Sequence, residues 1–127
     1  MTIVEVKNFD LNPGLRNIVN DFRRDNKIRY EYKFYKIFED DIFVASLIEY
    51  NIPIKNCLYF DLYVFKRVRR KGFGTKILNI YKNKNKNKDL FVRSNQESKN
   101  EFLKKNGFML IEDNINKNLY YFDNNEK

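Results

Sequence analysis

Residues 62–78 read LYVFKRVRRKGFGTKIL, and this is the most informative stretch of the chain. Its apolar start is typical of the end of a strand, and the basic turn that follows contains Gly72 and Gly74. Ile77 and Leu78 then mark the apolar face of an amphipathic helix. A strand that leads into a helix N-terminus through such a turn presents backbone N–H groups and cations together, and these groups bind phosphate. The stretch therefore predicts a seat for a phosphate or pyrophosphate group.

The composition predicts one soluble domain with a real core. The 127 residues are 43% hydrophobic and 17% aromatic, which argues against disorder over the whole length. The first residues show no signal-peptide pattern, and apolar runs such as 42–48 are too short to span a membrane. We therefore expect a single domain over residues 1–123, a frayed tail at 124–127 and a cytoplasmic location.

Two residue counts exclude familiar kinds of site. The chain has no histidine, so histidine-based catalytic triads and the usual zinc sites are excluded. Its single cysteine, Cys57, cannot form an internal disulfide and gives no metal cluster. We expect Cys57 to be a small buried hydrophobic residue, and we expect no metal.

The net charge of +8 is compatible with a polyanionic partner such as nucleic acid. Much of the excess lies in the sequence KNKNKNK at 82–88, which is typical of a solvated helix end or loop. The basic cluster at 66–71 is different, because it is compact and lies directly beside the glycines. We expect the basic cluster to be functional and the rest of the charge to reflect composition.

The remaining patterns predict a mixed sheet with helices on its faces. Pro13 after Asn12 predicts a helix start, the spacing of Ser94 and Glu97 fits a capping box, and Gly107 fits the position after a helix end. The expected helices cover 12–25, a segment that begins near 74, and 96–106. The expected strands cover 3–6, 30–34, 42–50, 57–64, 90–93, 108–112 and 119–122.

Two sequence elements together carry a family resemblance. The first is the stretch 62–78, with arginine at 69 and glycine at 72 and 74. The second is Asn95, the small residue Ser98 and the run KNGF at 105–108. With both, the chain resembles the GNAT superfamily of N-acetyltransferases over about residues 57–110. The resemblance implies an α/β (α+β) fold: a mixed, mostly antiparallel twisted sheet of six to seven strands flanked by about three helices. It also implies acetyl-CoA as co-substrate.

The resemblance implies roles for individual cofactor-binding residues. The backbone of 62–64 would hold the pantetheine arm as an added strand, and amides of 70–75 would surround the pyrophosphate. Glycine is expected at 72 and 74 because a Cβ would block the close approach of the backbone or the required φ. Asn95 would contact the pantetheine end. The implied cofactor-binding residues are Leu62, Tyr63, Val64, Arg69, Arg70, Lys71, Gly72, Phe73, Gly74, Thr75 and Asn95.

The catalytic residues are less clear from the sequence. A lysine-like amine has a pKa of about 10.4, so only about one molecule in 10³ is neutral at pH 7, and a carboxylate base would help. Asp61 is the first candidate, because the resemblance places an acidic residue there opposite the substrate amine in polyamine-type members. Glu49 on the neighbouring strand is the second candidate. The alternative for Asp61 is an ordinary polar residue on a sheet face.

Many family members also carry a tyrosine in the second helix that protonates the departing thiolate. The corresponding residue is Phe102 when counted from Asn95, or Leu103 when counted back from Gly107, and neither can donate a proton. A thiol pKa near about 8.5 makes thiolate a fair leaving group, so this loss need not abolish catalysis. The tyrosines that could substitute, although packing is the simpler role for each, are Tyr63, Tyr120 and Tyr121.

The resemblance implies an N-acetyltransferase that acts on a primary amine. The acceptor could be a small amine, a protein lysine or N-terminus, or an aminoacyl-tRNA, and the protein could be a monomer or a homodimer without membrane contact. Two alternatives remain open. One is a degenerate GNAT domain that binds CoA or a partner without turnover, and the other is a basic nucleic-acid-binding module.

Overall fold

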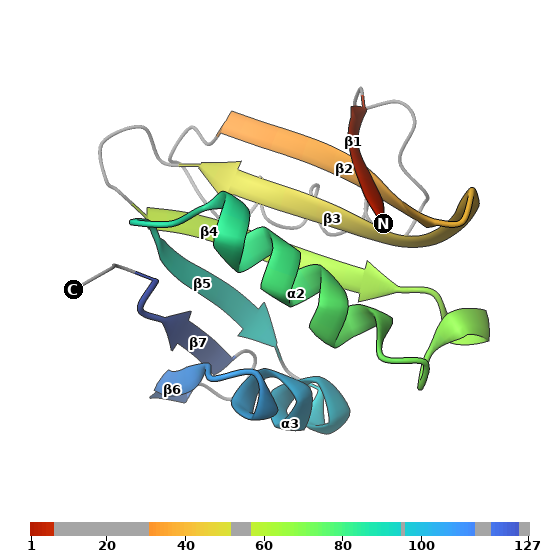
Figure 1. Cartoon of the computed structure of the whole chain (residues 1–127). Helices are drawn as coiled ribbons and strands as arrows, with labels where there is room; N and C mark the ends of the chain where they lie inside the picture. Colours follow the sequence, from red (N-terminus) through yellow and green to blue (C-terminus); the bar gives the residue numbers. More distant parts are fainter. Residues whose placement is uncertain (7–30, 52–56, 95, 114–117, 125–127) are drawn as a thin grey trace.

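A computed structural model describes residues 1–6, 31–51, 57–94, 96–113 and 118–124, which form one seven-stranded sheet and two α-helices (Figure 1). The strands are β1 (Thr2–Val6), β2 (Glu31–Glu39), β3 (Ile42–Asn51), β4 (Cys57–Val64), β5 (Asp89–Ser94), β6 (Met109–Asp113) and β7 (Asn118–Phe122). The helices are α2 (Phe73–Lys84) and α3 (Glu97–Lys105), and a short 3-10 helix covers Lys66–Val68. The helix predicted at 12–25 lies outside the described residues.

The strand order in the sheet is β1-β2-β3-β4-β5-β7-β6. Each neighbouring pair is antiparallel except β4 and β5, which are parallel. The predicted mixed, mostly antiparallel sheet is therefore confirmed. β2 continues to Glu39, beyond the predicted 30–34, and the prediction missed this extension because Phe34 and Tyr35 are both buried. A strand that is covered on both faces does not alternate cleanly in hydrophobicity.

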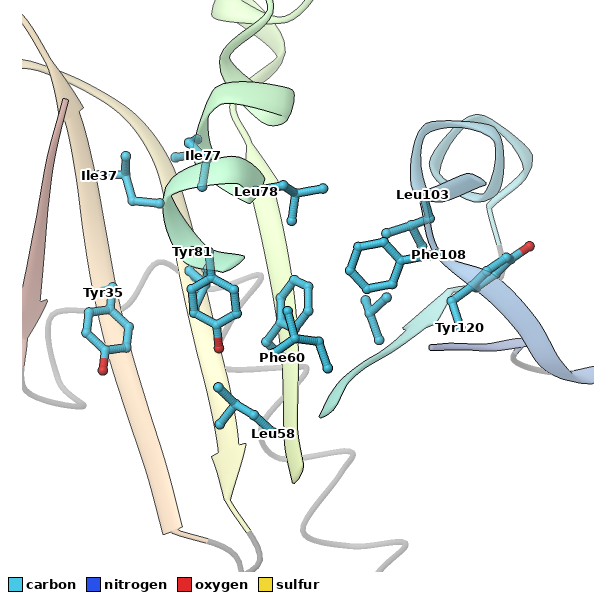
Figure 2. Close-up of a cluster of buried hydrophobic side chains, with 14 of the residues drawn as sticks. Tyr35, Ile37, Leu58, Phe60, Ile77, Leu78, Tyr81, Leu103, Phe108 and Tyr120 are labelled. Atoms are coloured by element: carbon cyan, nitrogen blue, oxygen red, sulfur yellow. The ribbon is translucent and has the colours of Figure 1, made fainter. Parts of the chain in front are cut away.

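The main core lies between the sheet and α2 (Figure 2). α2 buries Ile77, Leu78 and Tyr81, and their spacing places them on one face of the helix, as predicted. Phe60 of β4 packs against Tyr81, with ring centroids 4.8 Å apart. Among the described residues, no helix is long and apolar enough to cross a membrane.

The other face of the sheet carries a smaller buried cluster of Phe34, Ile48 and Tyr50. β4 contributes to both faces, because Phe60 belongs to the main core whereas Tyr59 packs against the smaller cluster. The sequence of this strand predicts Phe60, Leu62 and Val64 on one face and Tyr59, Asp61 and Tyr63 on the other, and the structure confirms this alternation. It matters for the site, because neighbouring residues of β4 point to opposite sides of the sheet.

The two ends of α3 gave different outcomes. The predicted capping box is wrong: Gln96 is the N-cap, and Ser94 is a buried residue of β5 whose hydroxyl accepts a 3.4 Å hydrogen bond from the amide of Gln96. At the other end, Gly107 has φ +88, and the amide of Phe108 donates to the carbonyl of Leu103 at 3.0 Å. This is the Schellman arrangement, so the predicted glycine after the helix end is confirmed.

Asn124, which we expected in a frayed tail, is held against the C-terminal end of α2. Its side-chain amide donates to the carbonyls of Lys82 and Asn85, each at 2.8 Å. Its own carbonyl accepts a 3.0 Å hydrogen bond from the amide of Asn87. The last residues, 125–127, lie outside the described part of the chain.

Candidate active site

β4 and β5 pair at one end only. Within the described residues, their ladder joins Cys57–Tyr59 to Asp89–Phe91 and stops there. β4 continues along β3 to Val64, while β5 continues along β7 to Ser94, and Figure 1 shows the two strands diverging toward the end where α2 begins. We call the stretches beyond the ladder, Phe60–Val64 and Val92–Ser94, the strand divergence. An extended ligand could pair with such a backbone edge.

The N-terminus of α2 lies at the same end of the sheet. Gly72 is its N-cap in a left-handed conformation, and the amide of Lys76 donates to the carbonyl of Gly72 at 3.1 Å. By helix geometry, the amides just before Lys76 have no partner within the helix. Arg70 and Lys71 lie exposed directly before this N-terminus. Amides, the positive end of the helix dipole and cations therefore coincide, which favours an anionic group.

Arg67 and Arg69 hold the basic turn in place. Arg69 donates from Nε to the carbonyl of Val64 at 2.8 Å, and its guanidinium lies 5.4 Å from the centre of the Tyr63 ring. Arg67 donates to the carbonyl of Phe43 on β3 at 2.6 Å. These contacts tie the turn to β3 and β4. Two of the cations predicted for phosphate thus have a structural task as well.

The two glycines of the turn serve different purposes. Gly72 has φ +78 and no neighbouring atom within 4 Å of a Cβ placed on it, so its backbone conformation explains the glycine, as expected. Gly74 has no such φ, and a Cβ there would lie 2.9 Å from Cζ of Phe102. At Gly74 the glycine therefore makes room for a ring of α3, a reason that the sequence did not reveal, and its approach to the cofactor stays a prediction.

α3 closes against the first turn of α2. Phe102 packs at Gly74, and the side-chain amide of Asn106 donates to the hydroxyl of Thr75 at 3.5 Å. Leu103 instead lies in the main core at 1% exposure. Of the two residues that could correspond to the family's tyrosine, Phe102 therefore packs at the first turn of α2, whereas Leu103 is buried in the main core.

Asp61 lies on β4 within the strand divergence, on the face opposite to Phe60. The ammonium group of Lys99 from α3 contacts Oδ1 of Asp61, and about a fifth of each side chain is exposed, 23% for Lys99 and 20% for Asp61. Sequence reasoning missed Lys99. The two residues are 38 positions apart, and no local pattern connects a helical lysine to a strand aspartate.

Glu49 lies on the opposite face from Asp61, in the main core. It is 8% exposed, and its carboxylate accepts hydrogen bonds from the hydroxyls of Tyr81 at 3.0 Å and Tyr35 at 3.4 Å. Burial raises the pKa of Glu49. Burial, and then the charge of Glu49, raises the pKa of Tyr81. The structure thus brings Asp61, and not Glu49, to the strand divergence.

The three tyrosines considered as proton donors have very different places. Tyr63 is 39% exposed and lies within the strand divergence, on the same face of β4 as Asp61. Tyr120 is 1% exposed in the main core. The hydroxyl of Tyr121 donates to Asp89 at 3.1 Å, at the paired end of β5. Of these three tyrosines, only Tyr63 lies at the strand divergence. The predicted cofactor-binding residue Asn95 lies outside the described residues.

The family comparison agrees with this arrangement. The family model described as an acetyltransferase (GNAT) domain matches residues 15–122. The chain belongs to the GNAT acetyltransferases. The predicted family is therefore confirmed, and with it the enzyme class. No curated protein matches the chain in sequence.

Solved structures show the same fold at low sequence identity. The ribosomal-protein-S18-alanine N-acetyltransferase of Escherichia coli is 12% identical with a TM-score of 0.68, covering 99% of this chain and 95% of its own. A GNAT family acetyltransferase of Elizabethkingia anophelis with acetyl-CoA bound is 15% identical with a TM-score of 0.67, covering 96% and 97%. A spermidine N-acetyltransferase SpeG mutant of Vibrio cholerae is 14% identical with a TM-score of 0.65, covering 95% and 94%.

Proposed function

We propose that this protein transfers an acetyl group from acetyl-CoA to a primary amine. The observation that carries the proposal is the strand divergence at the N-terminus of α2. There a strand edge, helix amides and exposed cations lie together. Membership of the GNAT acetyltransferases supports the same conclusion.

The residues at the strand divergence fit this cofactor. The backbone of Leu62–Val64 would pair with the extended pantetheine arm, because this part of β4 has no ladder with β5. The amides of 70–75 would hold the pyrophosphate, and the space around Gly72 is open. Arg69 would act mainly by keeping the turn on β4. Asn95 stays a prediction for the pantetheine end.

Acetyl-CoA supplies the acetyl group as a thioester, and transfer forms one C–N bond, breaks one C–S bond and yields an N-acetylated amine and the CoA thiol. Asp61 would bind the acceptor and take a proton from its nitrogen. A backbone N–H of Leu62–Val64 would stabilise negative charge on the carbonyl oxygen. The hydroxyl of Tyr63 would donate the proton that the sulfur requires.

The acceptor is proposed only as a class. A small amine, a protein lysine or N-terminus, and an aminoacyl-tRNA all present a primary amine. The net charge of +8 is compatible with an acceptor that carries negative charge elsewhere, such as a tRNA, but much of this charge reflects composition. A panel that includes each kind separates them.

The first test measures thermal stability with acetyl-CoA and then free-thiol release with the amine panel. We expect a rise in melting temperature and thiol release with at least one amine. The double variant Arg70→Ala/Lys71→Ala should bind acetyl-CoA about tenfold more weakly, since each of the two exposed charge pairs is worth about 0.2–1 kcal/mol. The matched control, Lys86→Ala/Lys88→Ala, removes the same charge beyond the other end of α2 and should bind normally.

Three other outcomes of these measurements would each favour a different conclusion. No thermal shift at millimolar acetyl-CoA would overturn the cofactor assignment. A shift without thiol release on any amine would favour a domain that binds CoA without turnover. Binding of RNA with a steep salt dependence, in the absence of CoA binding, would favour the nucleic-acid module.

A further inference from the structure

The contact between Lys99 and Asp61 bridges the two sides of the strand divergence. Asp61 belongs to β4, whereas Lys99 belongs to α3, which follows β5 in the chain. β4 and β5 are no longer paired at this level. An aliphatic ammonium group therefore already sits on the carboxylate that lies between the separated strands.

The surroundings of Asp61 suit a cation with an apolar stem. Its neighbours on the same face of β4 are Tyr59 and Tyr63, both aromatic. Tyr50 lies close enough to Asp61 for the carboxylate charge to contribute, after burial, to raising the pKa of Tyr50. Rings beside a carboxylate can contact the methylene groups of an alkylammonium and attract its charge.

The contact with Lys99 is also easy to exchange. Both side chains are about a fifth exposed, and a long lysine side chain loses rotamer freedom when it is held in one place. Replacing one ammonium group by another keeps this largely buried carboxylate paired, so the exchange avoids the cost of an unpaired buried charge. A second ammonium could therefore displace Lys99 without disrupting the fold.

We infer that Lys99 occupies the acceptor position at Asp61 and must be displaced before an acceptor amine binds. The inference rests on the proposed function, which assigns the acceptor to Asp61, and it adds a competing ammonium group that the protein itself supplies.

The test titrates n-butylammonium chloride into the whole protein without acetyl-CoA and follows binding by NMR chemical shifts. Lys99→Met keeps the aliphatic stem but removes the charge, so the variant should bind n-butylammonium about fivefold more tightly than the wild type. The double variant Asp61→Asn/Lys99→Met should lose that gain. Neutral n-butanol should show no such dependence on Lys99.

Lys104→Met is the matched control, because it removes one exposed lysine charge from the same helix. Equal affinity for n-butylammonium in Lys99→Met and the wild type would overturn the inference, and so would an equal gain in Lys104→Met. If Lys99 had only a structural role, Lys99→Met would lower the melting temperature without any gain in the affinity for n-butylammonium. Lys99→Gln gives a second variant should Lys99→Met fail to fold.

The titration with n-butylammonium tests the inference about Lys99, and the thermal-shift test with acetyl-CoA tests the proposed function. Either test can fail while the other succeeds. Binding of n-butylammonium on Asp61 without any binding of acetyl-CoA would leave the ammonium site standing and remove the proposed function. Binding of acetyl-CoA with no effect of Lys99 on n-butylammonium would do the reverse. When turnover is measurable, Lys99→Met should lower KM for n-butylamine, whereas Lys104→Met should not.

Discussion

Glu49 and Asp61 lie on neighbouring strands of one sheet, yet their surroundings differ in every respect that matters for catalysis. Glu49 is enclosed between the sheet and α2, and two tyrosine hydroxyls donate to it. Asp61 is partly exposed at the strand divergence, and its partner is a flexible ammonium group. One carboxylate is sealed and the other can exchange its partner.

The different surroundings of the two carboxylates indicate where a catalytic base can act in this fold. A base must meet an incoming amine and pass a proton on, so it needs a partner that can leave. The hydroxyls on Glu49 are part of the main core, and moving them would open the packing of α2. We therefore propose that the region around Glu49 serves stability and that the region around Asp61 binds the acceptor.

The variants Asp61→Asn and Glu49→Gln test the proposed roles of the two carboxylates most directly. Asp61→Asn should lower kcat/KM for the best amine by about 10² or more, the usual range for loss of an acid–base group. Glu49→Gln should leave kcat/KM within a few-fold, because its carboxylate lies away from the strand divergence. Steady-state thiol release and a melting curve for each variant provide the measurement. A large loss in Glu49→Gln with a normal Asp61→Asn would reverse the two assignments.

Gly74→Val tests how tightly α3 closes against α2 beside the strand divergence. The new side chain meets the ring of Phe102, so we expect a loss of about 2 kcal/mol in the free energy of unfolding. In a Phe102→Ala background the same change should cost clearly less. Gly72→Ala is the control, and it should cost about 1 kcal/mol in both backgrounds because its penalty comes from φ alone. Urea unfolding of the six proteins decides, and an equal cost of Gly74→Val in both backgrounds would contradict the packing explanation.

The parts of the fold that could be predicted from the sequence depend on local signals. The alternation along β4, the apolar face of α2 and Gly107 after α3 each act within a few residues of the chain. The same holds for the N-terminus of α2, where the glycine turn and the basic residues are adjacent in sequence. The turn and helix start that carry the proposed cofactor-binding residues were predictable for that reason.

The remaining features depend on contacts between distant residues. Nothing in the sequence indicates that Gly74 faces Phe102, or that Lys99 reaches Asp61 across the strand divergence. Glu49 stood as a candidate base because its strand neighbours Asp61, and only the packing of Tyr81 shows that it is sealed. A sequence pattern assigns a residue to a face, but the partner on that face comes from the tertiary structure.

Tyr81→Phe tests how firmly Glu49 is held in the main core. It removes the 3.0 Å hydrogen bond to a buried carboxylate, so we expect a loss of about 1–2 kcal/mol in the free energy of unfolding. Tyr35→Phe removes the longer 3.4 Å bond and should cost less. Urea unfolding at neutral pH compares them. A larger loss in the free energy of unfolding for Tyr35→Phe than for Tyr81→Phe would contradict this ranking of the two hydrogen bonds.

The pH dependence of the free energy of unfolding gives the smallest expected effect, and its direction follows from the pKa of Glu49. Burial raises the pKa of Glu49 in the folded protein, so between its unfolded and folded pKa values the native state binds more protons than the unfolded chain. The free energy of unfolding contributed by this group therefore falls as pH rises through that window. Glu49→Gln cannot titrate, so its stability relative to the wild type should increase as pH rises from about 4 to 7. Urea unfolding of both proteins across this range measures the difference. A relative stability that falls with rising pH would mean that the two tyrosine hydroxyls outweigh burial and lower the pKa of Glu49 in the folded protein.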